Sequence, residues 1–292
     1  MSRYQNNNLL GIGFMLLATL LFAVMDAMAK WLVTAEVSPV QVIAVRSWMI
    51  TPMILVMLIA RGELKQLATR QPVRHLARGM IGFLAPMSYF AALKTLPLAD
   101  ASVIFFSAAF MLTAASALVL KERVGIHRWS AVAVGFVGVI IAMDPSGGGG
   151  IVAYLLVLIA AMIYSLIFIW GKQLSRRDSV ISLVFSMNLG MGIVATAVSP
   201  WIWVPITPTM LIELALMAGF ALGAHYVFAA ALARAEVSVL APFEYSMLLW
   251  TVAIGYLVWG DLPTLEIWIG AALIIAAGIY VARREALHRS GR

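Results

Sequence analysis

Residues 16–32 read LLATLLFAVMDAMAKWL, and residues 158–174 read LIAAMIYSLIFIWGKQL. The two stretches align without a gap, and each is apolar over most of the length that a membrane-spanning helix needs. Leu16, Ala18, Lys30 and Leu32 match Leu158, Ala160, Lys172 and Leu174, and Phe22 corresponds to Tyr164. A stretch that recurs at this length in the second half of the chain indicates an internal duplication.

A second pair of segments extends the repeat. Residues 98–103 (LADASV) are similar to residues 234–239 (RAEVSV), so that Asp100 corresponds to Glu236. After a short gap, Glu122 and Trp129 correspond to Asp261 and Trp268. The chain is therefore predicted to consist of two related halves.

The composition places this duplicated chain in a membrane. Hydrophobic residues make up 63% and charged residues 11%, with a mean hydropathy of +0.98, whereas soluble domains carry about 45–50% apolar and about 25% charged residues. This excess excludes a soluble enzyme, a soluble nucleic-acid-binding domain and a disordered chain. A spanning helix needs about 20 apolar residues, and such stretches recur at 9–33, 39–60, 73–96, 97–120, 125–143, 151–171, 179–199, 207–232, 236–260 and 263–282. The sequence predicts an all-α integral membrane protein with ten transmembrane helices.

The repeat divides these helices into two sets of five. Because five is odd, the second half is predicted to enter the membrane upside down relative to the first. The predicted units are a first repeat at 1–143, a periplasmic glycine-rich linker at 144–150, and a second repeat at 151–292 with a short basic tail. Inverted repeats around a site at the membrane midplane are typical of alternating-access transporters.

The basic residues predict the orientation, because Lys and Arg concentrate in short cytoplasmic loops. All of the 20 Lys and Arg residues except Lys30, Arg46 and Lys94 fall in the two tails and in alternate loops. The loops near 34–38, 144–150, 200–206 and 261–262 contain none. Both termini are therefore predicted to be cytoplasmic. The net charge of +7 is then a consequence of topology, and no nucleic-acid partner is expected.

Charged residues inside the spans are the first candidates for a site, because each costs about 2.5–3.5 kcal/mol on insertion scales. Asp26 and Lys30 are four residues apart and share one helical face. They are either a proton-titrating carboxylate beside a cation, or a self-neutralised pair whose lysine reaches the surface. Arg46 either holds a substrate carboxylate in a bidentate contact or pairs with Asp26 to connect the first two helices.

The second half offers a further group. Glu244 follows Pro242, which removes a helical hydrogen bond, and interrupted spans at the midplane often mark binding sites. Glu244 either binds the substrate or a proton, or it is a partner for His225. His225 in turn either takes part in function or only packs against its neighbours. Tyr89, Trp170 and Tyr245 either form an apolar cage for a substrate side chain or simply pack. With no Cys and an isolated histidine, neither a metal nor a cofactor is predicted.

At this point the chain resembles the EamA-type branch of the drug/metabolite transporter superfamily, over nearly its whole length. The resemblance rests on Pro39, Arg46, Ala92-Leu93, Ala99 to Ala101, Leu120-Lys121-Glu122, Ala235-Glu236, Pro242, Gly260-Asp261, Trp268-Ile269-Gly270 and Leu273-Ile274. Two positions depart from the family pattern. Phe106 or Ser107 stands where the first half often has a proline, which puts a kink there in question, and Asp261 replaces the usual glutamate.

The resemblance implies a multi-pass exporter of the bacterial inner membrane, most similar to exporters of aromatic and other neutral amino acids. It implies alternating access around a central cavity, in a monomer or homodimer. Arg46 or Lys30 would attract the substrate carboxylate, Glu244 or His225 the ammonium or polar end, and Tyr89, Trp170 and Tyr245 the side chain. Asp26, and also Glu244, would carry a proton if export is proton-coupled.

Two other functions remain open. A promiscuous exporter of hydrophobic cations would depend on Asp26 and Glu244 and not on Arg46. A channel-like or assembly subunit would need no substrate site. An enzyme is not predicted, because the sequence has neither H-E-x-x-H nor G-x-S-x-G.

Overall fold

The structure is a computed structural model, and it describes residues 7–119, 125–143, 150–175 and 177–290. The described part is helical: α1 (Asn8–Thr34), α2 (Pro39–Arg61), η1 (Leu64–Leu67), α3 (Pro72–Gly82), α4 (Leu84–Leu93), α5 (Leu98–Phe105), α6 (Ala108–Val119), α7 (Ile126–Met143), α8 (Ile151–Leu174), α9 (Val180–Val198), η2 (Ser199–Trp201), α10 (Pro208–Leu232), α11 (Val237–Glu244), α12 (Ser246–Trp259) and α13 (Leu265–Ser290). Local signals set several boundaries. Pro39, Pro72 and Pro208 begin helices, where a missing N–H is tolerated. Gly62 and Gly260 end α2 and α12 with φ of 67° and 73°, a conformation that glycine adopts without strain.

Ten segments of the described chain are long and apolar enough to cross a membrane, which confirms the predicted all-helical, multi-pass class. Three of these spans consist of two consecutive α-helices each: α3 with α4, α5 with α6, and α11 with α12.

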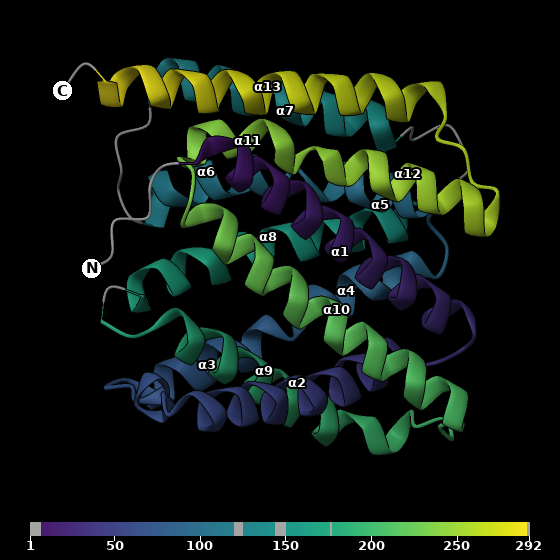
Figure 1. The fold of residues 1–292 in the computed structure, drawn as a ribbon. Helices are drawn as coiled ribbons and strands as arrows, with labels where there is room; N and C mark the ends of the chain where they lie inside the picture. Colours follow the sequence, from purple (N-terminus) through teal and green to yellow (C-terminus); the bar gives the residue numbers. More distant parts are fainter. Residues whose placement is uncertain (1–6, 120–124, 144–149, 176, 291–292) are drawn as a thin grey trace.

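Figure 1 shows how the spans are layered. Helices α7 and α13 lie side by side along one edge, and α2, α3 and α9 lie along the opposite edge. Between these edges α1 crosses α10, while α8 packs against α4, α5 and α6. Helix α1 begins and α13 ends on the same side of the bundle.

Hydrogen bonds between connecting segments define the two ends of the bundle. At the end where α1 begins, the Asn7 N–H donates to the Arg234 carbonyl at 3.2 Å, and Thr69 donates to Asp178 at 2.8 Å. We call this the basic end, because Arg61, Arg74, Arg128, Arg177 and Arg234 lie there. At the opposite end, Gln41 donates from its side-chain amide to the Val204 carbonyl at 2.7 Å.

Glycines allow the edge helices to approach closely. A Cβ atom on Gly270 of α13 would lie 2.5 Å from the Gly138 carbonyl oxygen of α7. A Cβ atom on Gly190 of α9 would lie 2.8 Å from the backbone of Gly79 in α3. Small residues at such contacts are the usual means by which membrane helices pack tightly.

The span formed by α5 and α6 is interrupted although it lacks the proline of the family pattern. Helix α5 ends at Phe105 and α6 begins at Ala108, and the Ser107 N–H bonds to the carbonyl three residues earlier instead of four. The hydroxyl of Ser165 on α8 donates to the Ala108 carbonyl at 2.9 Å. The kink that the missing proline put in question is therefore present, and a hydroxyl from a neighbouring helix binds a carbonyl at the interruption.

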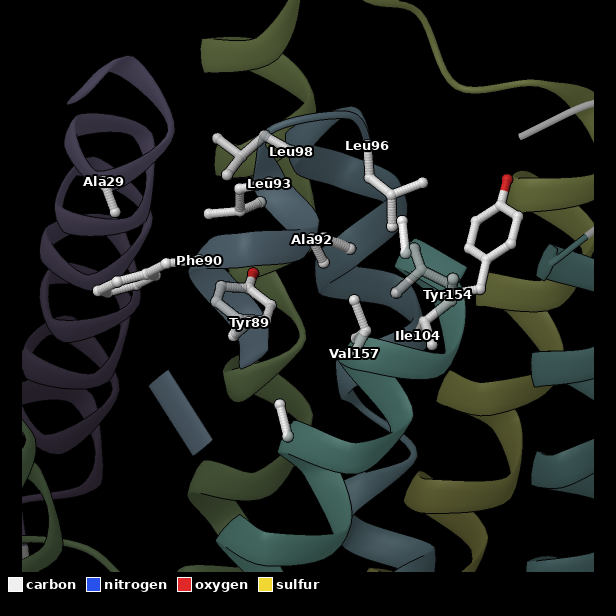
Figure 2. Close-up of a cluster of buried hydrophobic side chains, with 14 of the residues drawn as sticks. Ala29, Tyr89, Phe90, Ala92, Leu93, Leu96, Leu98, Ile104, Tyr154 and Val157 are labelled. Atoms are coloured by element: carbon white, nitrogen blue, oxygen red, sulfur yellow. The ribbon is translucent and has the colours of Figure 1, made fainter. Parts of the chain in front are cut away.

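The half of the bundle away from the basic end is closed by apolar side chains. In Figure 2, Phe90 of α4 points toward α1 near Ala29, and Ile104 of α5 lies beside Val157 of α8. All four are buried. The other labelled members of this group are Tyr89, Ala92, Leu93, Leu96, Leu98 and Tyr154.

Candidate functional site

Helix α8 shows where the bundle opens. Ala153, Val157 and Ala160 follow one face of the helix in steps of three and four residues, and all are buried. The same face continues to Tyr164 and Phe168, which are 45% and 48% exposed. This exposure is not the lipid-facing surface of α8, because that surface runs along the other side of the helix through Leu155, Ile159, Met162 and Leu166. Accessible space therefore lies inside the bundle next to Tyr164 and Phe168.

Helix α10 changes in the same way. Leu214, Ala218 and Ala221 share one face and are buried. His225 and Leu232 continue that face toward the basic end and are exposed. The inward faces of α8 and α10 are thus covered in one half of the bundle and accessible in the half near the basic end.

Aromatic rings line one side of this opening. Tyr89 of α4 contacts Phe105 of α5 with ring centroids 5.2 Å apart, and Phe105 contacts Tyr164 of α8 at 5.5 Å. Tyr164 then contacts Phe168 one turn further along α8 at 6.2 Å. The four rings form a continuous wall, which we call the aromatic wall, from the closed half into the accessible half.

A polar cluster lies at the closed end of the aromatic wall. The Tyr89 hydroxyl donates to Asp26 Oδ2 at 3.4 Å and lies 3.4 Å from Ser102 Oγ. Asp26 is 6% exposed and interacts electrostatically with Arg46 of α2. These two described side chains do not form a direct ion pair, so the predicted tie between the first two helices is an electrostatic one.

Arg46 retains donor capacity toward a ligand. Its guanidinium lies 5.8 Å from the Phe90 ring centroid, and its Nη1 is 3.7 Å from Met25 Sδ. Its Nε is buried without a hydrogen-bond partner among the described residues. A buried donor without a partner is unfavourable by about 1–3 kcal/mol, so an anionic or carbonyl oxygen that reached Arg46 would be stabilised.

His225 and Glu244 border the opening but do not pair with each other. The His225 ring packs edge-on against Phe22 of α1 with centroids 5.1 Å apart, and its electrostatic partner is Arg46. Glu244, at the end of α11, is half-buried and interacts electrostatically with Tyr164. The interpretation of Glu244 as a partner of His225 is therefore wrong for this structure, although both residues border the same opening.

Three of the sequence candidates lie elsewhere. Lys30 does not pair with Asp26: its Nζ is 2.8 Å from Asp261 Oδ2 and 4.8 Å from the Trp259 ring centroid. Trp170 follows Leu166 by one turn on the lipid-facing side of α8, away from the aromatic wall. The third is Tyr245.

Tyr245 stands at the interruption between α11 and α12. Its ring contacts Phe106 at 5.1 Å, and its hydroxyl packs where Gly278 of α13 has no side chain. It lines an apolar groove of about 460 Å³ between α1, α5 and α11 to α13, and not the opening beside Arg46. The structure thus does not bring Tyr89, Trp170 and Tyr245 together, and Tyr89 instead belongs to a row of rings with Phe105, Tyr164 and Phe168.

The sequence profile of the EamA-like transporter family matches residues 9–143 and matches a second time at residues 151–283. The chain belongs to the EamA-like transporter family. Members of this family are transporters and not enzymes, in agreement with the sequence prediction. The chain is therefore a multi-pass membrane transporter.

Relatives of this EamA-family chain span nearly its whole length. A riboflavin transporter of Rhizobium johnstonii is 28% identical over 283 residues, covering 94% of this chain and 91% of the relative. An S-adenosylmethionine uptake transporter of Rickettsia bellii is 27% identical, covering 94% of each chain. A riboflavin transporter of Vibrio cholerae is 27% identical, covering 96% of this chain and 95% of the relative. A solved crystal structure, 20% identical, has the same fold with a TM-score of 0.63, covering 95% of this chain and 97% of the other.

None of these relatives is named an amino-acid exporter. The similarity to amino-acid exporters implied by the sequence therefore gains no support from them, whereas membership of the family is confirmed.

Proposed function

We propose that this protein is an alternating-access carrier of the bacterial inner membrane for a small metabolite with a planar ring and an anionic or carbonyl oxygen that Arg46 can bind. Residues 1–143 and 151–292 are its two inverted repeats, joined through 144–150, and the basic end faces the cytoplasm. The double match to one family profile supports the repeats. The concentration of Lys and Arg at one end supports the orientation.

The observation that carries the substrate class is the aromatic wall, whose closed end at Tyr89 contacts Asp26, the electrostatic partner of Arg46. Tyr164 and Phe168 expose their rings to the opening, and flat ring systems stack on such side chains with about 0.5–1.5 kcal/mol beyond area burial. Arg46 supplies a cation with an unused N–H at the far end of the wall. Asp26 balances this charge when no ligand is bound.

The names of the relatives narrow the ring type. Riboflavin and S-adenosylmethionine both contain a fused heteroaromatic ring, and we assign this chain to a substrate of that kind. An aromatic amino acid, which also combines a ring with a carboxylate, is the second candidate, because Arg46 would bind its carboxylate.

Counterflow in proteoliposomes tests the function. Vesicles loaded with unlabelled riboflavin, S-adenosylmethionine or tryptophan are diluted into the labelled compound. A carrier accumulates label transiently and saturably, whereas a channel or assembly subunit does not. Lipophilic cations serve as a fourth substrate. Their accumulation, without any for the ring compounds, would contradict the proposal.

Variants connect the activity to the site. Arg46→Ala should reduce counterflow at least tenfold, and Arg46→Lys should retain part of it. Arg74→Ala is the matched control, because Arg74 is exposed at the basic end and its hydrogen bond within the described chain is to nearby Gln71. Full activity of Arg46→Ala would reject the site assignment while leaving the carrier function intact.

The absence of Cys makes the orientation directly testable. Single cysteines at Ser175 and Thr95, both exposed and at opposite ends, would be probed with an impermeant maleimide in intact spheroplasts. We expect labelling at Thr95→Cys alone, and at Ser175→Cys only after permeabilisation.

A further inference from the structure

A second buried group of charges lies at the end of the bundle opposite the basic end. Lys30 of α1 and Asp261, which follows α12, form an ion pair of 2.8 Å. Their side chains are 7% and 30% exposed. The ammonium also lies over the Trp259 ring at 4.8 Å, so it is held from two sides.

Asp100 adds a second carboxylate to this pair. It lies in the first turn of α5 and is 7% exposed, and its Oδ1 has no hydrogen-bond partner among the described residues. Its electrostatic neighbours are Asp261 and Lys30. Two carboxylates therefore share one ammonium, and one buried carboxylate oxygen is unused.

The two carboxylates and one ammonium of this cluster do not balance in charge. With both carboxylates ionised, the cluster of Lys30, Asp100 and Asp261 carries one excess negative charge in a mostly buried position. Buried charges without compensation are strongly unfavourable. A further monovalent cation bound between Asp100 and Asp261 would restore neutrality and give Asp100 Oδ1 a partner.

The internal repeat contains a charged counterpart of each of these three residues. Lys30 and Asp100 correspond to Lys172 and Glu236 in the second half, and Asp261 corresponds to Glu122 in the first half. Three separate aligned segments thus preserve one basic and two acidic residues in each repeat. Glu122 lies outside the described residues, so the comparison with that copy is one of sequence alone.

Other titratable groups near this end belong to the helices that pack against α5. They are Tyr89 of α4, whose hydroxyl bonds to Asp26 and Ser102, Tyr154 of α8, and Glu266 of α13. Glu36 and Lys94 form a separate exposed pair of 3.2 Å at the same end. Only Lys30 and Asp261 are electrostatic neighbours of Asp100 by the interactions found in the described chain.

We propose that Asp100 and Asp261, positioned by Lys30, bind one monovalent cation, a proton or a sodium ion, at the closed end of the transporter. The ion neutralises the cluster and so stabilises this closed arrangement. The site goes beyond the proposed substrate site and shares no residue with it.

Thermal unfolding of the detergent-solubilised full chain, without substrate, tests the site. One arm compares sodium chloride with choline chloride at equal ionic strength at pH 8. The other arm lowers the pH from 8 to 6 in choline chloride. Binding to the folded state raises the melting temperature, and we expect an increase of about 2–4 °C in at least one arm, which identifies the ion.

The variants separate this site from other titrating groups. Asp100→Asn, which keeps size and shape, should lose the increase. Lys30→Gln should enlarge it, because removing the ammonium leaves two unbalanced carboxylates. Glu36→Gln is the control and should behave as wild type, since Glu36 is 85% exposed. Each variant is used only if it elutes from size-exclusion chromatography as a single folded species.

Two results would overturn the proposal. One is an unchanged melting temperature of the wild type in both arms. The other is an equal increase in Asp100→Asn and in the wild type. Because the assay contains no transported compound, neither result depends on the substrate assignment.

Discussion

The hydroxyl of Thr19 on α1 lies 2.7 Å from the hydroxyl of Ser246, the first residue of α12. Ser165 of α8 bonds in a similar way to Ala108, the first residue of α6. In each case the first helix of one half supplies a hydroxyl to an interrupted span of the other half. The two halves are thus fastened to each other at the points where their helices are broken.

Removing the hydroxyl contact should weaken this fastening. Thr19→Val and Ser246→Ala should each lower the free energy of unfolding by about 0.5–1.5 kcal/mol. The double variant should lose less than the sum, because both changes remove one bond. Chemical unfolding in mixed micelles measures this. Thr34→Val is the control, since the bonds of its hydroxyl among the described residues lie within α1. Strict additivity would contradict the prediction.

The contact between α7 and α13 has no room for a side chain at Gly270. A Cβ atom there would meet the Gly138 carbonyl at 2.5 Å and the Ala142 Cβ at 2.6 Å. Gly270→Ala should therefore destabilise the protein by about 1–3 kcal/mol through overpacking. Gly219→Ala, where nothing lies within 4 Å, should be neutral or slightly stabilising. Equal melting temperatures of the two variants would show that the helices separate easily.

Because of Asp178, the folded protein should lose stability in acid. Hydrogen bonds from Thr69 and His75 to its carboxylate lower the pKa of Asp178. A lowered pKa means that the stabilisation is present above the ordinary value of about 3.9 and is lost as the pH falls through the lowered one. The difference in melting temperature between wild type and Asp178→Asn should be constant from about pH 7 to 5 and shrink below about pH 4. Glu63→Gln, at an exposed position, should show no such difference.

The ring of Tyr164 should matter for substrate binding more than its hydroxyl. Tyr164→Leu should raise the KM for the transported compound about 2- to 10-fold, the equivalent of a lost stacking contact. Tyr164→Phe should remain close to wild type. Leu166→Ala on the lipid-facing side of α8 is the control. Initial rates of uptake into proteoliposomes measure all three, and an unchanged KM in Tyr164→Leu would remove this residue from the site.

The fold could be read from the sequence because long apolar stretches leave few alternatives in a membrane. The predicted span at 97–120 is observed at Leu98–Leu118. The interruptions were harder to predict, because the break near Ser107 has no proline and involves a hydroxyl from another helix. Such a contact depends on the packing of distant segments, which the local sequence does not reveal.

The site could be predicted only in part for the same reason. His225 and Glu244 border the opening, and Asp26, Arg46 and Tyr89 lie together at the closed end of the aromatic wall, as polar residues inside apolar spans tend to do. The spacing of Asp26 and Lys30 suggested a pair, but the lysine binds a carboxylate 231 positions away in the chain. Phe105 and Phe168 carried no signal beyond composition. The repeat gives Lys30, Asp100 and Asp261 a charged counterpart each, but it does not reveal that the three lie together, because Asp261 comes from the other half.

The apolar group of Figure 2 also has an electrical consequence. Phe90, Leu93 and Ile104 are buried in the closed half, so an ion that passed between them would have to shed its water among hydrocarbon side chains. We therefore expect the resting protein not to conduct ions, so that cells can hold many copies without dissipating their membrane potential.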